Sequence, residues 1–330
     1  MNVLDAILSR ARRDPVRIAM PEGEDPRVLR AALRLARERI ATPLLVGEAQ
    51  TVRLAAERAS VELGPVAIVE PGRHAAHDRC AHAAREALAP RGATAEEVER
   101  CLGDPLYYAA SMVRAGLADG TLAGATHSTA ETLRAALRII GPARSTGTVS
   151  SFFLMALRQP TSAGDDVLAF ADCGLIPYPD AAQLATIARQ TAAQFRLLVE
   201  REPRVALLSF STAGSASHPS VDSVRAARDL LAAGDADFEF DGEMQVDAAL
   251  VPDVARAKLA RSPVAGRANV LIFPNLDAGN IAYKLVERLA GATALGPLVQ
   301  GLARPFMDLS RGCKPDDIVS VACIASALAD

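Results

Sequence analysis

Short apolar segments alternate with amphipathic helical segments along most of this chain, and this alternation restricts the fold more than any other feature. The expected strands are Arg17–Met20, Pro43–Gly47, Val66–Val69, Thr121–Gly124, Val149–Met155, Val167–Ala171, Val205–Phe210 and Asn269–Phe273. The expected helices include Pro26–Ile40, Ala130–Ile140, Ala181–Val199, Val221–Ala233 and Ala278–Ala290. Continuous apolar strands that alternate with helices are typical of a mainly parallel sheet with helices on both faces. We therefore predict an α/β fold.

Two breaks in this alternation suggest where domains meet. A chain of 330 residues exceeds the size at which one hydrophobic core usually divides. The breaks lie at Gly141–Gly147, which has the composition of a hinge, and near Gly291–Pro297. We predict a discontinuous first domain, 1–146 plus 291–330, with a second domain, 147–290, inserted between the breaks.

Composition excludes several classes of function. A formal charge of −3 and an aromatic content of 4% argue against a nucleic-acid partner. No apolar run approaches the ~20 residues that span a bilayer, and the first residues are predicted to form a short amphipathic helix rather than a signal peptide. The five cysteines are scattered and lack a CxxC spacing, so we expect free thiols in a cytoplasmic protein.

The segment from Asp308 to Val319, DLSRGCKPDDIV, carries the most chemistry. It places Ser310 and Arg311 just before the start of an expected helix, and Asp317 in its first turn. Helix starts favour anions, and the planar guanidinium of arginine grips phosphate well. We predict a phosphate seat here, with a nearby carboxylate that accepts a proton. For Asp316, complementation of the helix dipole is the favoured explanation.

Two further strand-to-helix transitions carry polar groups. In GATHSTA, Ser128 and Thr129 either cap the following helix or hold a phosphoryl or acyl oxygen, with Arg134 one turn or two beyond. In FPNLDAGNIAYK, Asn280 and Lys284 share one helical face near the carboxyl end of a strand, where α/β sheets bind ligands. Here too, a purely structural helix start remains an open alternative.

Metal ligation is not expected. The group that superficially looks like a metal cluster lies on an expected exposed helix and has no matching ligands elsewhere; it comprises His74, His77, Cys80 and His82.

Taken together and in order, many segments of the chain resemble phosphate acetyltransferase. They are MPEGEDPRVLRAA, DPLYYAASMVRAGLADG, HSTAETLRAAL, TVSSFFLM, FADCGLIPYPDAAQLA, LSFSTAGSASHP, FDGEMQVDAA, SPVAGRANVLIFPNLDAGNIAYK, LGPLVQG and DLSRG. The resemblance runs from about Ile18 to Ala327. It implies a two-domain α/β/α sandwich like isocitrate and isopropylmalate dehydrogenases, a homodimer, and an active site in the cleft between domains. It also implies reversible acetyl transfer between CoA and phosphate, with acetyl-CoA and phosphate as substrates and no metal or bound cofactor.

The resemblance also implies roles for individual residues. Ser310 is expected to hydrogen-bond the CoA sulfur, Arg311 to bind phosphate, and Asp317 to act as the base. Arg134 resembles the family's substrate-binding arginine. The remaining phosphate and acyl site is expected to comprise Ser128, Thr129, Asn280 and Lys284.

One departure concerns CoA. The family has an arginine before the DPLY segment that binds the 3′-phosphate of CoA, and this chain has Leu88 there, flanked by Arg85 and Arg91. The alternatives that stay open are a phosphate acyltransferase for butyryl or propionyl groups, a non-catalytic acetyl-CoA sensor, and an NAD-dependent decarboxylating dehydrogenase of the same broad fold.

Overall fold

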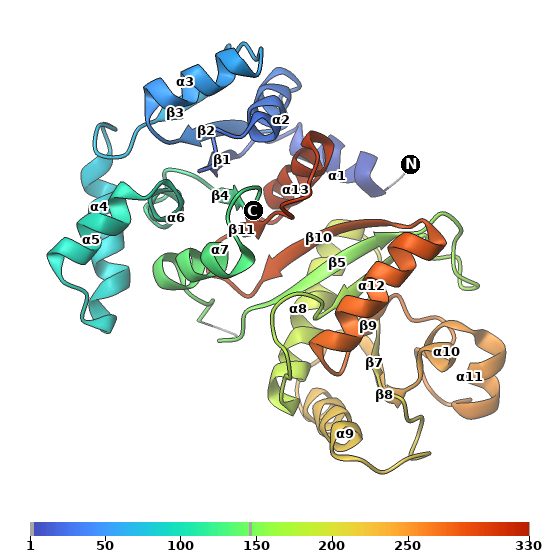
Figure 1. The fold of residues 1–330 in the computed structure, drawn as a ribbon. Coiled ribbons are helices and arrows are strands. Elements are labelled where there is room, and N and C mark those ends of the chain that lie inside the picture. The colour runs from blue at the N-terminus through green and yellow to red at the C-terminus, as the bar shows by residue number, and fades with distance from the viewer. Residues whose placement is uncertain (1–2, 145–146, 330) are drawn as a thin grey trace. The chain divides into compact units, whose positions relative to one another are not determined.

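A computed structural model describes residues 3–144 and 147–329. The chain divides into two compact units, residues 1–147 with 302–330 and residues 148–301 (Figure 1). Each unit has its own sheet with helices on both faces, so the predicted α/β fold class is confirmed.

The first unit is built on a five-stranded parallel sheet in the order β11-β4-β1-β2-β3. Its strands are β1 (Arg17–Met20), β2 (Thr42–Val46), β3 (Ala67–Val69), β4 (Gly120–Ala123) and β11 (Phe306–Asp308). Its helices are α1 (Val3–Ala11), α2 (Pro26–Arg37), α3 (Ala49–Arg58), α4 (His77–Leu88), α5 (Ala95–Gly103), α6 (Pro105–Arg114), α7 (Thr129–Ala135) and α13 (Pro315–Ala327). Helix α13 packs on α1 and α2, whereas α4, α5 and α7 pack around α6.

The second unit has a six-stranded mixed sheet in the order β10-β5-β6-β9-β7-β8. Its strands are β5 (Ser150–Ala156), β6 (Val167–Ala171), β7 (Arg204–Leu208), β8 (Glu239–Met244), β9 (Val270–Ile272) and β10 (Thr293–Gln300). Its helices are α8 (Ala181–Val199), α9 (Pro219–Ala232), α10 (Val246–Leu250), α11 (Pro252–Lys258) and α12 (Leu276–Ala290). Only the pairs β10–β5 and β5–β6 are antiparallel among the described strands.

Local sequence signals explain where the important helices begin. Asp25 accepts a hydrogen bond from the backbone N–H of Arg27, and Pro26 follows it at the first position of α2. Ser128 forms a reciprocal capping box with Glu131 at the start of α7. Such caps pair backbone N–H groups that a helix leaves without partners.

The domain boundary expected at residue 291 differs from the observed division. Strand β10 covers the predicted break at Gly291–Pro297 and pairs with β5, so residues 291–301 belong to the second unit. The register shifts between Leu295 and Leu298, which lets the ladder continue past Pro297, a residue without an N–H. The first expected break, 141–147, includes residues 145–146, which lie outside the described residues.

Candidate functional site

Three neighbouring strands of the first unit end at one edge of its sheet. Strands β1, β4 and β11 lie side by side and parallel, so their carboxyl ends and the loops that follow them converge. Open α/β sheets bind ligands at such edges. The loop after β11 contains Ser310 and Arg311, and the loop after β4 leads to Ser128 and Thr129.

A buried carboxylate organises the loop after β4. Glu22, only 5% exposed, accepts hydrogen bonds from four successive backbone N–H groups. These donors are Gly124, Ala125, Thr126 and His127, at 2.8–3.1 Å. Nδ1 of His127 lies 2.8 Å from Oε1 of Glu22. The loop is therefore shaped around a negative charge that the protein itself supplies.

This arrangement shifts two pKa values. Burial alone would raise the pKa of Glu22, but the hydrogen bonds from His127, Thr126 and Ala125 lower it to about 2. The hydrogen bond to Glu22 raises the pKa of His127. The two groups thus favour the charged ion pair.

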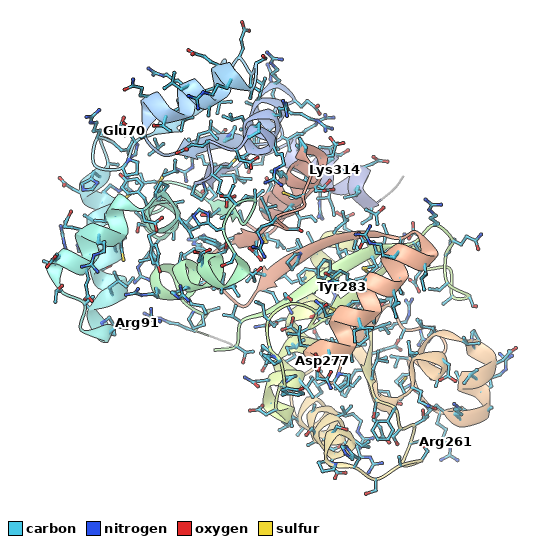
Figure 2. The ribbon with its side chains drawn as sticks, viewed as in Figure 1. Glu70, Arg91, Arg261, Asp277, Tyr283 and Lys314 are labelled. Carbon is cyan, nitrogen blue, oxygen red and sulfur yellow. The ribbon has the colours of Figure 1, made fainter. Side chains whose placement is uncertain are left out.

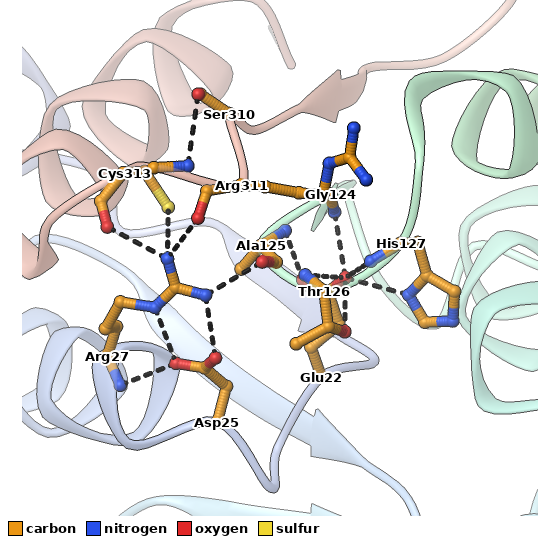
Figure 3. Close-up of polar contacts among 11 residues, drawn as sticks. Glu22, Asp25, Arg27, Gly124, Ala125, Thr126, His127, Ser310, Arg311 and Cys313 are labelled. Carbon is orange, nitrogen blue, oxygen red and sulfur yellow. Dashed lines mark hydrogen bonds and ion pairs between the residues drawn. The ribbon is translucent and has the colours of Figure 1, made fainter.

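Arg27 connects this loop to the loop after β11. Its guanidinium pairs with Asp25 and donates hydrogen bonds to three backbone carbonyls, as Figure 3 shows. The acceptors are Arg311 at 2.6 Å, Ala125 at 2.8 Å and Cys313 at 3.2 Å. One side chain therefore fixes the backbone of both loops.

The predicted catalytic residues lie on the loop after β11, whose backbone Arg27 holds, or at the start of the helix that follows it. Ser310 and Arg311 are exposed, and Oγ of Ser310 accepts a hydrogen bond from the N–H of Gly312. Lys314 precedes α13 (Figure 2), and its N–H donates to Oδ2 of Asp317 at 2.8 Å. Asp317 is exposed, and this contact makes it a cap for its own helix. Pro315 occupies the first helical position, as its sequence position predicts.

The predicted oxygen-binding residues at the start of α7 make structural contacts of their own. The hydroxyl of Ser128 donates to Glu131 at 2.8 Å. The hydroxyl of Thr129 donates to Oδ2 of Asp308 at 2.6 Å. Arg134 is exposed in the last turn of α7. The structure therefore ties Thr129 to a carboxyl group two residues before Ser310.

The last two predicted site residues, Asn280 and Lys284, belong to the second unit. Both lie on α12, which begins after its cap Asn275. Asn280 donates from Nδ2 to the carbonyl of Cys173 at 3.0 Å, so it anchors the segment after β6. Lys284 is exposed, with Nζ 5.7 Å from the ring centroid of Tyr283.

Leu88 does not face solvent. It is fully buried at the end of α4, within the core of the first unit. Arg85 and Arg91 are both exposed, and Arg91 donates to the carbonyl of Leu137 at 3.3 Å.

Three organising residues have no role in the sequence-based prediction: Glu22, Arg27 and Asp308. Glu22 and Arg27 stand in the segment MPEGEDPR, and Asp308 opens the DLSRG segment. For Glu22 and Arg27, a usable signal was a strand followed by acidic residues and by a helix that begins with an Asp-Pro pair. Nothing in the chain's spacing indicates that their partners are backbone groups about a hundred or more residues away.

The structure describes no group of three or more metal-ligating side chains within residues 3–144 and 147–329. Within the same residues, no helix is both long and apolar enough to cross a membrane.

The fold places the chain in a class of two-unit α/β proteins. Among solved structures, a 4-hydroxythreonine-4-phosphate dehydrogenase from Klebsiella pneumoniae aligns with a TM-score of 0.58 and 11% identity, over 96% of this chain and 100% of that one. At this identity the likeness concerns the fold alone. It agrees with the predicted dehydrogenase-like architecture.

Sequence comparison is more specific. A family model described as "Phosphate acetyl/butaryl transferase" matches residues 2–326. A phosphate acetyltransferase of Paracoccus denitrificans is 47% identical over 326 residues, which cover 99% of each chain. A phosphotransacetylase structure from Streptococcus pyogenes aligns with a TM-score of 0.92 and 38% identity, over 99% of this chain and 98% of that one. The chain therefore belongs to the phosphate acetyl/butyryl transferase family, and the resemblance predicted from its motifs is confirmed.

Proposed function

We propose that this protein is a phosphate acetyltransferase, an acyltransferase that moves an acetyl group reversibly between CoA and phosphate. The observation that carries the proposal is that Arg27 and Glu22 hold the Ser310–Arg311 loop and the loop leading to α7 at one sheet edge. This edge presents the exposed cationic side chain of Arg311. A phosphate group is a suitable ligand for such an edge.

The proposed reaction is a direct attack. The CoA thiolate attacks the acetyl carbon of acetyl phosphate, the bond between carbon and phosphate oxygen breaks, and phosphate leaves with the electron pair. Arg311 stabilises the phosphate charge, and Arg134 with Ser128 assists. Ser310 hydrogen-bonds the sulfur, and Asp317 acts as a base. Because the thiolate is the nucleophile and a free thiol has a pKa of about 8.5, removal of the proton matters at neutral pH.

The proposed substrate site also includes Thr129, Asn280 and Lys284. CoA enters as a substrate, with no metal and no permanently bound cofactor. A cytoplasmic location is also proposed, because all five cysteines are free thiols.

A homodimer is part of the proposal as well. Helix α12 exposes three large apolar side chains spaced four residues apart, namely Ile281, Leu285 and Leu289. Residues at this spacing lie along one side of a helix. Burial of this stripe against a second copy would remove it from water.

The roles are tested with Arg311→Ala and Asp317→Asn, and with Arg30→Ala as a matched control from an exposed site on α2. Arg311→Ala is expected to raise the KM for acetyl phosphate and to lower kcat, and Asp317→Asn to lower mainly kcat. Kinetics equal to those of Arg30→Ala in both variants would remove these roles. A comparison of acetyl-, propionyl- and butyryl-CoA decides the acyl preference, since the family name covers acetyl and butyryl transfer.

A further inference from the structure

A buried carboxyl group lies directly behind the proposed substrate edge. Asp308 is the last residue of β11, pairs in register with Ala123 of β4, and is 2% exposed. Its Oδ2 accepts a hydrogen bond of 2.6 Å from the hydroxyl of Thr129. Thr129 is itself exposed, so a buried carboxyl group connects to the surface through one hydroxyl.

The surroundings of Asp308 favour its neutral form more than is usual for a carboxyl group. Burial raises the pKa of Asp308 to about 6, against the lowering effect of the Thr129 and Thr132 hydroxyls, and the charge of Glu22 adds to the increase. These three residues are the polar and charged groups that act on it: two from α7 and one from the segment after β1. A base works best near neutral pH when its pKa lies not far below 7.

Asp317 is differently placed. It is exposed, and one of its oxygens already accepts the N–H of Lys314. The site therefore gains from a second proton acceptor.

We infer that Asp308, acting through the hydroxyl of Thr129, is a second acceptor for the proton of the CoA thiol, on a route separate from Asp317. This inference rests on the proposed acetyl transfer. Because Thr129 donates its own hydrogen to Asp308, the lone pairs of its oxygen are free to accept one from outside. Asp308 is thus a positioning residue and proton store, and Thr129 is the group that meets the substrate.

Two hydrogens and one acyl group move in the proposed step. The S–H bond breaks and its proton moves to Oγ1 of Thr129, while the hydrogen that Thr129 carried moves to Oδ2 of Asp308. The sulfur forms the bond to the acetyl carbon, and phosphate leaves with the electron pair of the broken C–O bond. In the reverse direction, Asp308 returns the proton to the departing sulfur along the same path.

The test is the pH dependence of kcat/KM for CoA with saturating acetyl phosphate, from pH 5 to 8. The wild type is compared with Asp308→Asn, Thr129→Val, Thr129→Ser and Asp317→Asn. Asn at position 308 can still accept the Thr129 hydrogen bond but cannot take up the proton. Thr186→Val is the matched control, because its hydroxyl donates to the carbonyl of Ala182 on α8, in the second unit, and takes no part in the contacts of Asp308.

The inference predicts that wild-type kcat/KM falls as the pH drops below about 6, because protonated Asp308 cannot accept a further proton. Asp308→Asn and Thr129→Val should lower the plateau, the constant kcat/KM at higher pH, roughly 10²-fold. They should also lose the acid limb, which is the decrease of kcat/KM at low pH. Thr129→Ser should restore the plateau to within about twofold, because the hydroxyl is retained. Asp317→Asn should keep the limb, and Thr186→Val should keep both the limb and the plateau.

An acid limb that persists in Asp308→Asn belongs to a substrate or to another residue, and it overturns the inference while the proposed function stands. A wild-type plateau in Thr129→Val overturns it equally. Absence of acetyl transfer by the wild type contradicts the proposed function itself, and the inference falls with it.

Discussion

The guanidinium of Arg27 donates a hydrogen bond of 2.6 Å to the backbone carbonyl of Arg311. The same guanidinium donates to the carbonyl of Ala125, on the loop that leads to α7. Two segments of the proposed substrate edge thus share one support, although they lie almost two hundred residues apart in the chain. The position of the Arg311 side chain depends on a residue that need not touch the substrate.

Replacement of Arg27 by alanine should therefore affect phosphate more than CoA. With the Arg311 backbone released, we expect the KM for phosphate to rise and kcat to fall roughly 10²-fold, because a misplacement of about 1 Å costs that much. Initial rates at varied phosphate and varied acetyl-CoA measure both effects. Added guanidinium ion should restore part of kcat in Arg27→Ala and none in the exposed-site control Arg30→Ala. Equal kinetics of the two variants would show that the support is dispensable.

Glu22 should make the free energy of unfolding of the protein decrease at low pH. Hydrogen bonds from His127, Thr126 and Ala125 outweigh burial and lower its pKa from 4.5 to about 2. The unfolded state therefore takes up the proton first as the pH falls. The stabilisation, ~3 kcal/mol, is complete above about pH 4.5 and is lost as the pH approaches 2.

Urea unfolding at pH 7 and pH 3 tests this dependence. Glu22→Gln should be less stable than the wild type at pH 7, and the difference should shrink at pH 3. Glu62→Gln, at an exposed position, is the matched control and should follow the wild type at both values. A gap between Glu22→Gln and the wild type that stays constant with pH would contradict the account.

Gly124 should not tolerate a side chain. Its φ is +109°, and a Cβ there would lie 2.5 Å from Oδ1 of Asp308 and 2.6 Å from the backbone of Leu309. Gly116 also has a positive φ, +69°, but a Cβ there would meet nothing within 4 Å. We expect Gly116→Ala to cost about 1 kcal/mol and Gly124→Ala at least ~3 kcal/mol, with loss of activity. Urea unfolding measures the loss of stability in the two variants. Similar losses in Gly124→Ala and Gly116→Ala would argue against close packing of the loop after β4 on the loop after β11.

The apolar stripe on α12 should support self-association. Leu285→Glu places a charge at the middle of the stripe and should weaken the dimer at least roughly tenfold, since about 1.4 kcal/mol corresponds to that factor. Leu54→Glu, at a leucine exposed on α3, serves as the control. Light scattering over a concentration series gives the dimer fraction. A Leu285→Glu protein that dimerises like the wild type would place the interface elsewhere.

Periodicity predicts the regular elements of this fold well and its irregular ones poorly. The strands expected at Arg17–Met20 and Val167–Ala171 have the observed ends, because each is a short apolar run with clear flanks. Strand β8 contains charged residues at an edge of the sheet, and β10 contains Gly296 and Pro297, so neither has a strand-like pattern. The misplaced domain boundary follows from missing β10.

The candidate site shows the same limit. Ser128 was correctly expected at a helix cap because capping is a local interaction. Glu22 and Arg27 act on backbone groups of distant segments, and Asp308 gains its unusual proton affinity from burial. Burial and long-range backbone contacts depend on the tertiary fold, so one sequence does not display them.

The central claim is tested most directly by incubating the wild-type protein with acetyl-CoA, with and without phosphate, and measuring free thiol and acetyl phosphate together. The account predicts that CoA is released only when phosphate is present, with one acetyl phosphate formed per thiol, and that acetyl-CoA is used in preference to butyryl-CoA. Binding of acetyl-CoA without release of thiol, or release that does not depend on phosphate, would contradict it.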